Sequence, residues 1–384
     1  MIKRFIILFA FVFLYSIQVL AVPPDTLDFG FMRYYKEQSL LYYEPIQSVI
    51  MTSDQDRSYP STVVFKDSVV FLTPNGFVTK SEPLSSLLNV SVSTSQKGKY
   101  IYIFGPFSDK PGGRHEVFDC LGNKVMQRED VGRVGLNGYG MPLEKSQRFL
   151  LGLNGIVTLT TFEGKRVNDV TMLSQENYED GDIVISITPD ENKIFAAVNK
   201  YKMPQAGADP EFVVFDGKLK VLSRRVLPYK LIVSQQCSSD GKYIWLRVEL
   251  SDGSAPVIIC DSTGAELFRL DNPQMAKFSA DAQYLFNVKR SARATLLETA
   301  TWDSVYAPYI PVTGFNWIDA DISDNGNIVA FYEGNRLLIG DRIENSSGFI
   351  TFPYAFRNVR LYDHGKRMVL SGEFGAVVYH ALDK

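Results

Sequence analysis

The sequence predicts an all-β chain that folds as a β-propeller of four-stranded blades. Two series of turn motifs recur in step along most of the 384 residues, and short stretches with strand-like alternation of apolar and polar residues separate them. One central unit shows the pattern most clearly. Its four expected strands are residues 231–237, 242–250, 257–260 and 265–270. Turns rich in Ser, Asp and Gly join the first strand to the second and the third to the fourth.

The first turn of this unit is Ser238-Ser239-Asp240-Gly241. Asp in such a turn bonds nearby backbone, and Gly supplies a positive φ. An apolar residue closely follows each copy of the turn, and successive copies of this residue are 40 to 49 positions apart: Tyr100, Phe149, Ile194, Tyr243, Tyr284, Ile328 and Met368. A period of roughly 40–50 residues is typical of propeller blades. Seven copies predict seven blades, or eight if residues 45–80 form a blade of their own.

The chain stops three strands into its last unit, at residues 358–361, 367–371 and 376–380. We expect a strand from the N-terminal region to complete this blade, because a ring closed in this way leaves no open edge. The chain then divides into segment 1–21, an aromatic-rich segment 22–60 and a propeller domain 61–384.

Segment 1–21 has the parts of a secretory signal peptide. Lys3 and Arg4 form a basic start, residues 5–15 are apolar, and Val19-Leu20-Ala21 resembles a cleavage site. We therefore expect a secreted or periplasmic protein with no transmembrane segment after cleavage. Removal of the segment changes the net charge from −3 to −5, which argues against a nucleic-acid partner.

The Ser-x-Asp-Gly-Lys turn at residues 238–242 resembles the turn between the first two strands of each blade in bacterial secreted WD-repeat-like propellers of the TolB type. The resemblance covers about residues 61–384 and implies the propeller fold. It assigns no activity, because one scaffold hosts many functions.

The three cysteines are expected to be free, buried thiols. Cys237 and Cys260 fall on the first and third strands of one blade. The intervening strand keeps their Cα atoms too far apart for a disulfide. Cys120 makes the count odd, so at least one thiol cannot be in a disulfide within the chain.

Long connections are expected on the face of the ring opposite the short turns, at residues 104–116, 199–210, 249–256 and 302–315. Binding residues are often carried by long loops on a rigid scaffold, so this face is the predicted binding face. Its candidate residues are Arg114, His115, Tyr201, Met203, Trp302, Tyr306, Tyr309, Phe315 and Trp317. The alternative for the aromatic residues is packing between blades.

The first strands are expected to line a central channel. Lys277, Asp321 and Arg360 come from three successive first strands and can meet there. They would either bind an anionic ligand or solvate a water-filled channel. Asp319, Asp321 and Asp324 are candidate calcium ligands, although Asp324 also has a role in its turn. No other cofactor is expected.

No catalytic motif stands out in the sequence, so a binding or scaffolding module is favoured over an enzyme. We expect a monomer with a protein or envelope-polymer partner. The alternative is a propeller enzyme, a lyase or hydrolase with a polar site in the channel, assisted by calcium. A third hypothesis is a structural envelope protein without a discrete ligand.

Overall fold

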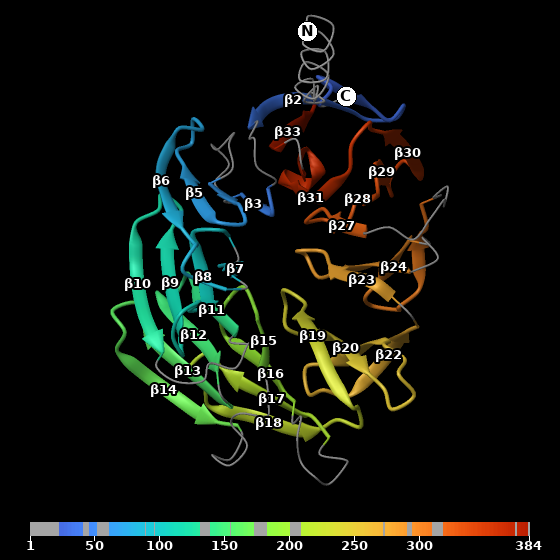
Figure 1. Ribbon diagram of the computed structural model, residues 1–384. Coiled ribbons are helices and arrows are strands. Elements are labelled where there is room, and N and C mark those ends of the chain that lie inside the picture. The colour runs from blue at the N-terminus through green and yellow to red at the C-terminus, as the bar shows by residue number, and fades with distance from the viewer. Residues whose placement is uncertain are drawn as a thin grey trace, which may run out of the picture.

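The computed structural model describes residues 23–40, 46–51, 61–88, 90–95, 97–130, 139–153, 155–172, 183–199, 209–271, 273–289, 294–308, 318–372 and 375–382. These residues form eight antiparallel sheets arranged as blades around a central axis (Figure 1). The predicted β-propeller is therefore confirmed. The signal-like segment 1–21 lies outside the described residues.

Seven blades consist of four strands that are consecutive in the chain, and the first strand of each lies nearest the axis (Figure 1). We number the blades in chain order. Blade 1 contains β3 (Ser48–Ile50), β4 (Thr62–Val64), β5 (Ser68–Leu72) and β6 (Val78–Pro83). Blade 2 contains β7 (Ser91–Thr94), β8 (Tyr100–Pro106), β9 (Gly113–Asp119) and β10 (Lys124–Asp130). Blade 3 contains β11 (Tyr139–Leu143), β12 (Arg148–Leu153), β13 (Ile156–Thr161) and β14 (Arg166–Thr171).

The next four blades repeat this order. Blade 4 contains β15 (Ile183–Ile187), β16 (Lys193–Val198), β17 (Glu211–Asp216) and β18 (Val221–Val226). Blade 5 contains β19 (Leu231–Cys237), β20 (Tyr243–Glu249), β21 (Val257–Asp261) and β22 (Glu266–Leu270). Blade 6 contains β23 (Pro273–Phe278), β24 (Tyr284–Lys289), β25 (Ala294–Glu298) and β26 (Ser304–Tyr306). Blade 7 contains β27 (Ile318–Ile322), β28 (Ile328–Glu333), β29 (Arg336–Asp341) and β30 (Ser346–Thr351).

Blade 8 closes the ring with strands from both ends of the chain. The C-terminal part supplies β31 (Phe356–Tyr362), the 3₁₀ turn η2 (Asp363–Gly365), β32 (Arg367–Gly372) and β33 (Gly375–Ala381). The N-terminal part supplies β2 (Arg33–Leu40), which pairs antiparallel with β33, and β1 (Thr26–Asp28) outside it. The predicted closure by an N-terminal strand is confirmed.

The ring has eight blades, which is the alternative in which residues 45–80 form a blade of their own. The number of turn motifs did not reveal blade 1, because the repeated tight turn does not join its first two strands. In the seven other blades four or five residues separate strands one and two, whereas β3 ends at Ile50 and β4 begins at Thr62.

Hydrogen bonds within the first turn explain why its motif recurs. In blade 5 the Ser238 hydroxyl donates to Asp240 Oδ1 at 2.7 Å and accepts from the Tyr243 N–H at 3.0 Å. Asp240 Oδ1 also accepts from the Lys242 N–H at 3.0 Å. The same network forms in blades 4, 6 and 7 around Thr188, Ser279 and Ser323. A Ser or Thr followed two residues later by Asp or Asn thus fixes the hairpin by satisfying its backbone donors.

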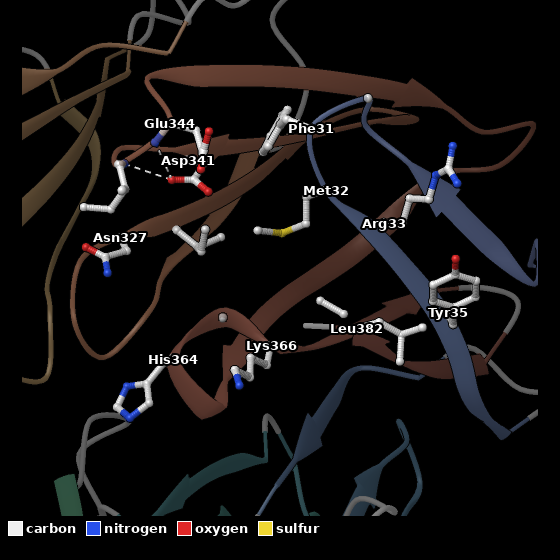
Figure 2. A pocket seen from close by; sticks show the side chains of 15 residues that line it. Phe31, Met32, Arg33, Tyr35, Asn327, Asp341, Glu344, His364, Lys366 and Leu382 are labelled. Atoms are coloured by element: carbon white, nitrogen blue, oxygen red, sulfur yellow. Dashed lines mark hydrogen bonds between the residues drawn. The ribbon is translucent and has the colours of Figure 1, made fainter. Parts of the chain in front are cut away.

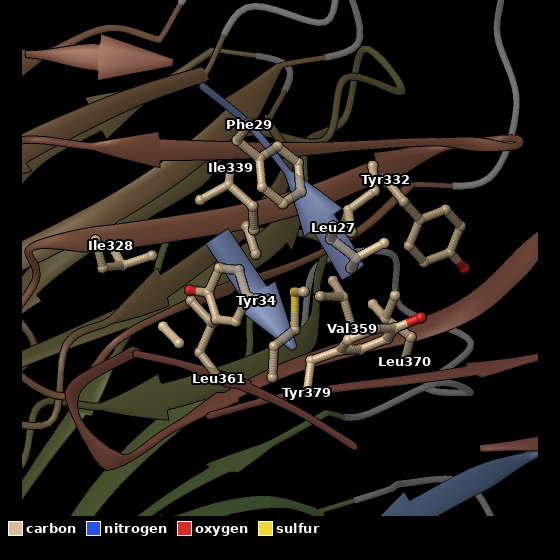
Figure 3. Packing of buried hydrophobic residues seen from close by; sticks show 14 of the residues in the cluster. Leu27, Phe29, Tyr34, Ile328, Tyr332, Ile339, Val359, Leu361, Leu370 and Tyr379 are labelled. Carbon is tan, nitrogen blue, oxygen red and sulfur yellow. The ribbon is translucent and has the colours of Figure 1, made fainter. Parts of the chain in front are cut away.

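The N-terminal strands pack into the seam between blades 7 and 8 (Figure 3). Leu27 and Tyr34 are fully buried there beside Ile339 of blade 7 and Val359 and Tyr379 of blade 8. The Tyr34 hydroxyl donates to the Gly365 carbonyl at 2.6 Å. Ring closure therefore combines β2–β33 pairing with burial of apolar side chains from three segments of the chain.

Gly365 lies where blade 8 packs closely against blade 7. Its φ is +88°, and a Cβ added to it would lie 2.7 Å from Ile328 Cγ1 in blade 7. We expect Gly365→Ala to lower the free energy of unfolding by about 1–2 kcal/mol from backbone strain and a further ~1–3 kcal/mol from overpacking. Gly164→Ala is the control, because its φ is +83° but no atom lies within 4 Å of the added Cβ. Equal losses for the two variants in urea denaturation would contradict close packing at Gly365.

None of the three cysteines is in a disulfide, as predicted. Cys237 and Cys260 are buried, and burial raises the pKa of each thiol to about 12. Cys120 is only half-buried, which differs from the expected full burial.

We expect a thiol reagent at pH 8 to label Cys120 first in the native protein, since the two buried thiols are protonated and shielded. Time-resolved labelling with Ellman's reagent checks this, and Cys120→Ser should remove the fast phase. Fast labelling that persists in the variant would contradict the burial of Cys237 and Cys260.

Candidate functional site

The channel candidates come together as two ion pairs on three neighbouring first strands. Lys277 on β23 pairs with Asp321 on β27, and Arg360 on β31 pairs with Asp319 on β27. The Asp321 side chain is 3% exposed and that of Lys277 is 32% exposed. The residues thus meet, but as neutralised pairs.

The two aspartates also connect blade 7 to blade 8 through backbone hydrogen bonds. Asp319 Oδ2 accepts from the Val359 N–H at 3.0 Å, and Asp321 Oδ2 accepts from the Leu361 N–H at 2.8 Å. Burial lowers the pKa of Arg360, but the carboxylates of Asp319 and Asp321 offset this, so that the pKa is raised. The arrangement keeps Arg360 charged and holds two first strands together.

The third calcium candidate, Asp324, lies in the turn after β27. Burial raises the pKa of its carboxyl group; the charge of His364 opposes this shift and that of Asp321 adds to it. Within the described residues, no group of three or more His, Cys, Asp or Glu side chains is placed to hold a metal ion.

Arg114 and His115 lie within β9, because β8 and β9 extend further than the sequence indicated. His115 is fully buried, its Nδ1 lies 2.7 Å from the Tyr102 hydroxyl, and its ring stacks on Phe104. Arg114 pairs with Glu116, with Nε 3.1 Å from Oε2. The expected exposure of these two residues on a loop is wrong: the His115 side chain is entirely buried and that of Arg114 is 18% exposed.

The aromatic candidates that the structure describes pack between blades. Trp302 belongs to the turn between β25 and β26, on the face opposite the long loops, where it stacks on Phe268 of blade 5 with ring centroids 5.9 Å apart. Tyr306 is buried and donates to the Ser346 carbonyl of blade 7 at 2.6 Å. For both residues the alternative of packing between blades is confirmed. The other candidates lie outside the described residues: Tyr201, Met203, Tyr309, Phe315 and Trp317.

A cavity with a volume of ≈ 570 Å³ opens at the seam between blades 7 and 8. Its walls come from the β1–β2 hairpin, the β27–β28 and β29–β30 turns of blade 7, η2 and the end of β33. Because these turns join first to second and third to fourth strands, the cavity lies on the short-turn face. We call it the seam cavity.

Acidic side chains line one side of the seam cavity, and basic side chains line the opposite side (Figure 2). Asp341 and Glu344 lie on one side, and His364 and Lys366 lie on the other. Met32 projects between them, so the cavity combines a polar wall of each sign with an apolar interior.

The sequence did not predict this site. Its walls are far apart in the chain, and Asp341 occupies the position of the turn aspartates Asp119, Asp216 and Asp261 in other blades, each of which accepts two backbone N–H groups. The one available signal was that a charged residue recurs at this turn.

A scan of the chain against protein-family models finds no match, and a search of curated proteins finds no relative. In the part of the chain that the structure describes, none of the helices has the length and apolar character needed to span a membrane.

Proposed function

We propose that the protein is a secreted or periplasmic binding and scaffolding module that presents its long-loop face to a protein or envelope-polymer partner. The asymmetry of the two faces carries this proposal. Outside blade 1, four or five residues connect strands one to two and three to four, whereas the connections on the other face range from 2 to 12 residues. Variable loops on a rigid ring are suited to recognition.

The short-turn face uses many polar groups to join blades, which supports assigning the binding role to the other face. Glu144 of blade 3 accepts from the Lys97 and Lys99 N–H groups of blade 2 at 3.0 and 3.1 Å. Glu191 of blade 4 accepts from the Lys145 and Ser146 N–H groups of blade 3 at 2.7 and 2.9 Å. These carboxylates are engaged within the fold.

Export is supported by the basic and apolar parts of residues 1–21, and kinship with TolB-type propellers is supported by the Ser-x-Asp-Gly-Lys turn at 238–242. Export and kinship with these propellers therefore belong to the proposed function.

Site-specific photo-crosslinking in the native envelope tests the binding face. A crosslinking residue is placed at Ser108 or Asp252, which are exposed on long connections, and at Asn123 or Thr263, which are matched exposed positions on short turns. We expect adducts with a defined partner from the first pair only. Adducts mainly from the second pair, or equally from both, would contradict the proposal.

The alternative, a lyase or hydrolase using the channel, has one favourable observation, the contact between Lys277 and Asp321. Both charges are already neutralised in pairs, and Asp321 also accepts two backbone N–H groups. A structural role accounts for these contacts, so the binding module remains our conclusion.

A further inference from the structure

Asp341 differs from the turn aspartates of other blades in what surrounds it. Like them, it uses Oδ1 to accept two backbone N–H groups, those of Ile343 at 2.9 Å and Glu344 at 3.1 Å. The residue is only 9% exposed, and its side chain lines the seam cavity, which the N-terminal hairpin and η2 flank. The added strands of blade 8 thus convert an ordinary turn residue into a cavity wall.

The second oxygen of Asp341, Oδ2, has no hydrogen-bond donor among the described residues. Figure 2 shows the carboxylate directed toward the interior of the cavity beside Glu344. A buried carboxylate with an open acceptor favours an ammonium group, since hydrogen bonds between ions are stronger than those between neutral groups.

The other walls specify the rest of a ligand. Lys366 and His364 lie across the cavity from Asp341 and would attract an anionic group, while Met32 lies between the two sides and Phe31 and Leu382 add apolar surface to the lining. The volume of ≈ 570 Å³ is within the range of small-molecule sites. A ligand that satisfies all the walls carries an ammonium group, an apolar body and a carboxylate.

We propose that the seam cavity binds a dipeptide-sized zwitterion with apolar side chains. Its ammonium group contacts Asp341, its carboxylate lies at Lys366 and His364, and its side chains cover Met32. This site lies on the face opposite the proposed partner-binding loops, and the two proposals stand independently.

Isothermal titration calorimetry with leucyl-leucine tests the site, with the N-acetyl and C-terminal amide forms of the same dipeptide as probes for each charge. We expect the zwitterion to bind and each analogue that lacks one charge to bind about tenfold or more weakly. Asp341→Asn keeps an oxygen that can accept the turn hydrogen bonds but removes the charge, and it should weaken binding of the zwitterion by a similar factor.

Asp261→Asn is the matched control, because Asp261 occupies the same turn position in blade 5 and does not line the seam cavity. It should leave binding unchanged. Lys366→Gln changes an exposed position. Its affinity for the dipeptide tests the site even if Asp341→Asn does not fold. Absence of binding at millimolar dipeptide, equal binding of the N-acetyl form, or unchanged affinity in Lys366→Gln would overturn the proposal.

Discussion

Replacing Tyr34 with alanine is expected to lower the free energy of unfolding by about 3–5 kcal/mol, the range for loss of a large buried aromatic side chain. Tyr34 is fully buried between blades 7 and 8, and its ring lies edge-on to Phe29 with centroids 6.2 Å apart. Its hydroxyl is also a donor to the buried Gly365. The variant therefore loses apolar packing and a hydrogen bond at the point where the ring closes. Urea denaturation followed by intrinsic fluorescence measures the loss.

Two variants separate the contributions at this position. Tyr34→Phe keeps the ring and removes only the hydroxyl, so the loss should fall to about 1 kcal/mol. Tyr35→Ala removes the neighbouring side chain on β2, which is 38% exposed, and should cost less than about 1 kcal/mol. If Tyr34→Ala were no more destabilising than Tyr35→Ala, the N-terminal strand would not be the closing element of the ring.

Replacing Asp321 with alanine is expected to cost about 2–4 kcal/mol of stability. The change leaves the Leu361 N–H without its acceptor, and an unsatisfied buried donor costs about 1–3 kcal/mol. It also removes the partner of Lys277. Breaking a fully buried pair costs about 3–5 kcal/mol, but the Lys277 side chain is 32% exposed, and water at its ammonium group reduces that part of the loss.

The partner variant Lys277→Met should be milder, at about 1–2 kcal/mol, because Asp321 keeps its backbone donors from Ile322 and Leu361. Asp321→Asn, which retains an acceptor oxygen, should fall between the two. Thermal and urea unfolding of the three variants measures the order. A larger loss for Lys277→Met than for Asp321→Ala would show that the ion pair, and not the connection between blades 7 and 8, dominates at this position.

The repeated turns made much of the fold predictable from the sequence. The Ser238–Asp240 pair and its counterparts act within five residues of chain, so their chemistry is visible without tertiary information. The three strands left over at the C-terminus predicted closure by an N-terminal strand for a similarly direct reason: an open sheet edge has unpaired backbone groups. Blade 1 was harder to count, because its β3–β4 connection has no such local motif.

The candidate site was less predictable, because exposure depends on which blades pack together. His115 looked like an exposed loop residue, but extension of β8 and β9 placed it between Tyr102 and Phe104. Trp302 was assigned to a long connection, but β26 interrupts that connection and leaves the residue in a short turn. Lys277 and Asp321 were correctly expected to meet, since alternation along first strands of successive blades is a local rule, whereas Arg360 pairs with Asp319.

The sequence by itself determined the blade repeat, the short-turn chemistry and the need for an N-terminal strand, because each follows from contacts local in the chain or from the pairing of backbone groups. Only the tertiary structure decided which polar groups neutralise one another and where a cavity opens. Asp319 and Arg360 are paired across two blades, and Asp341 shares the seam cavity with residues 30–35 and 364–366 from other parts of the chain. Side chains that meet through ring closure have no sequence proximity, so their juxtaposition is set by packing alone.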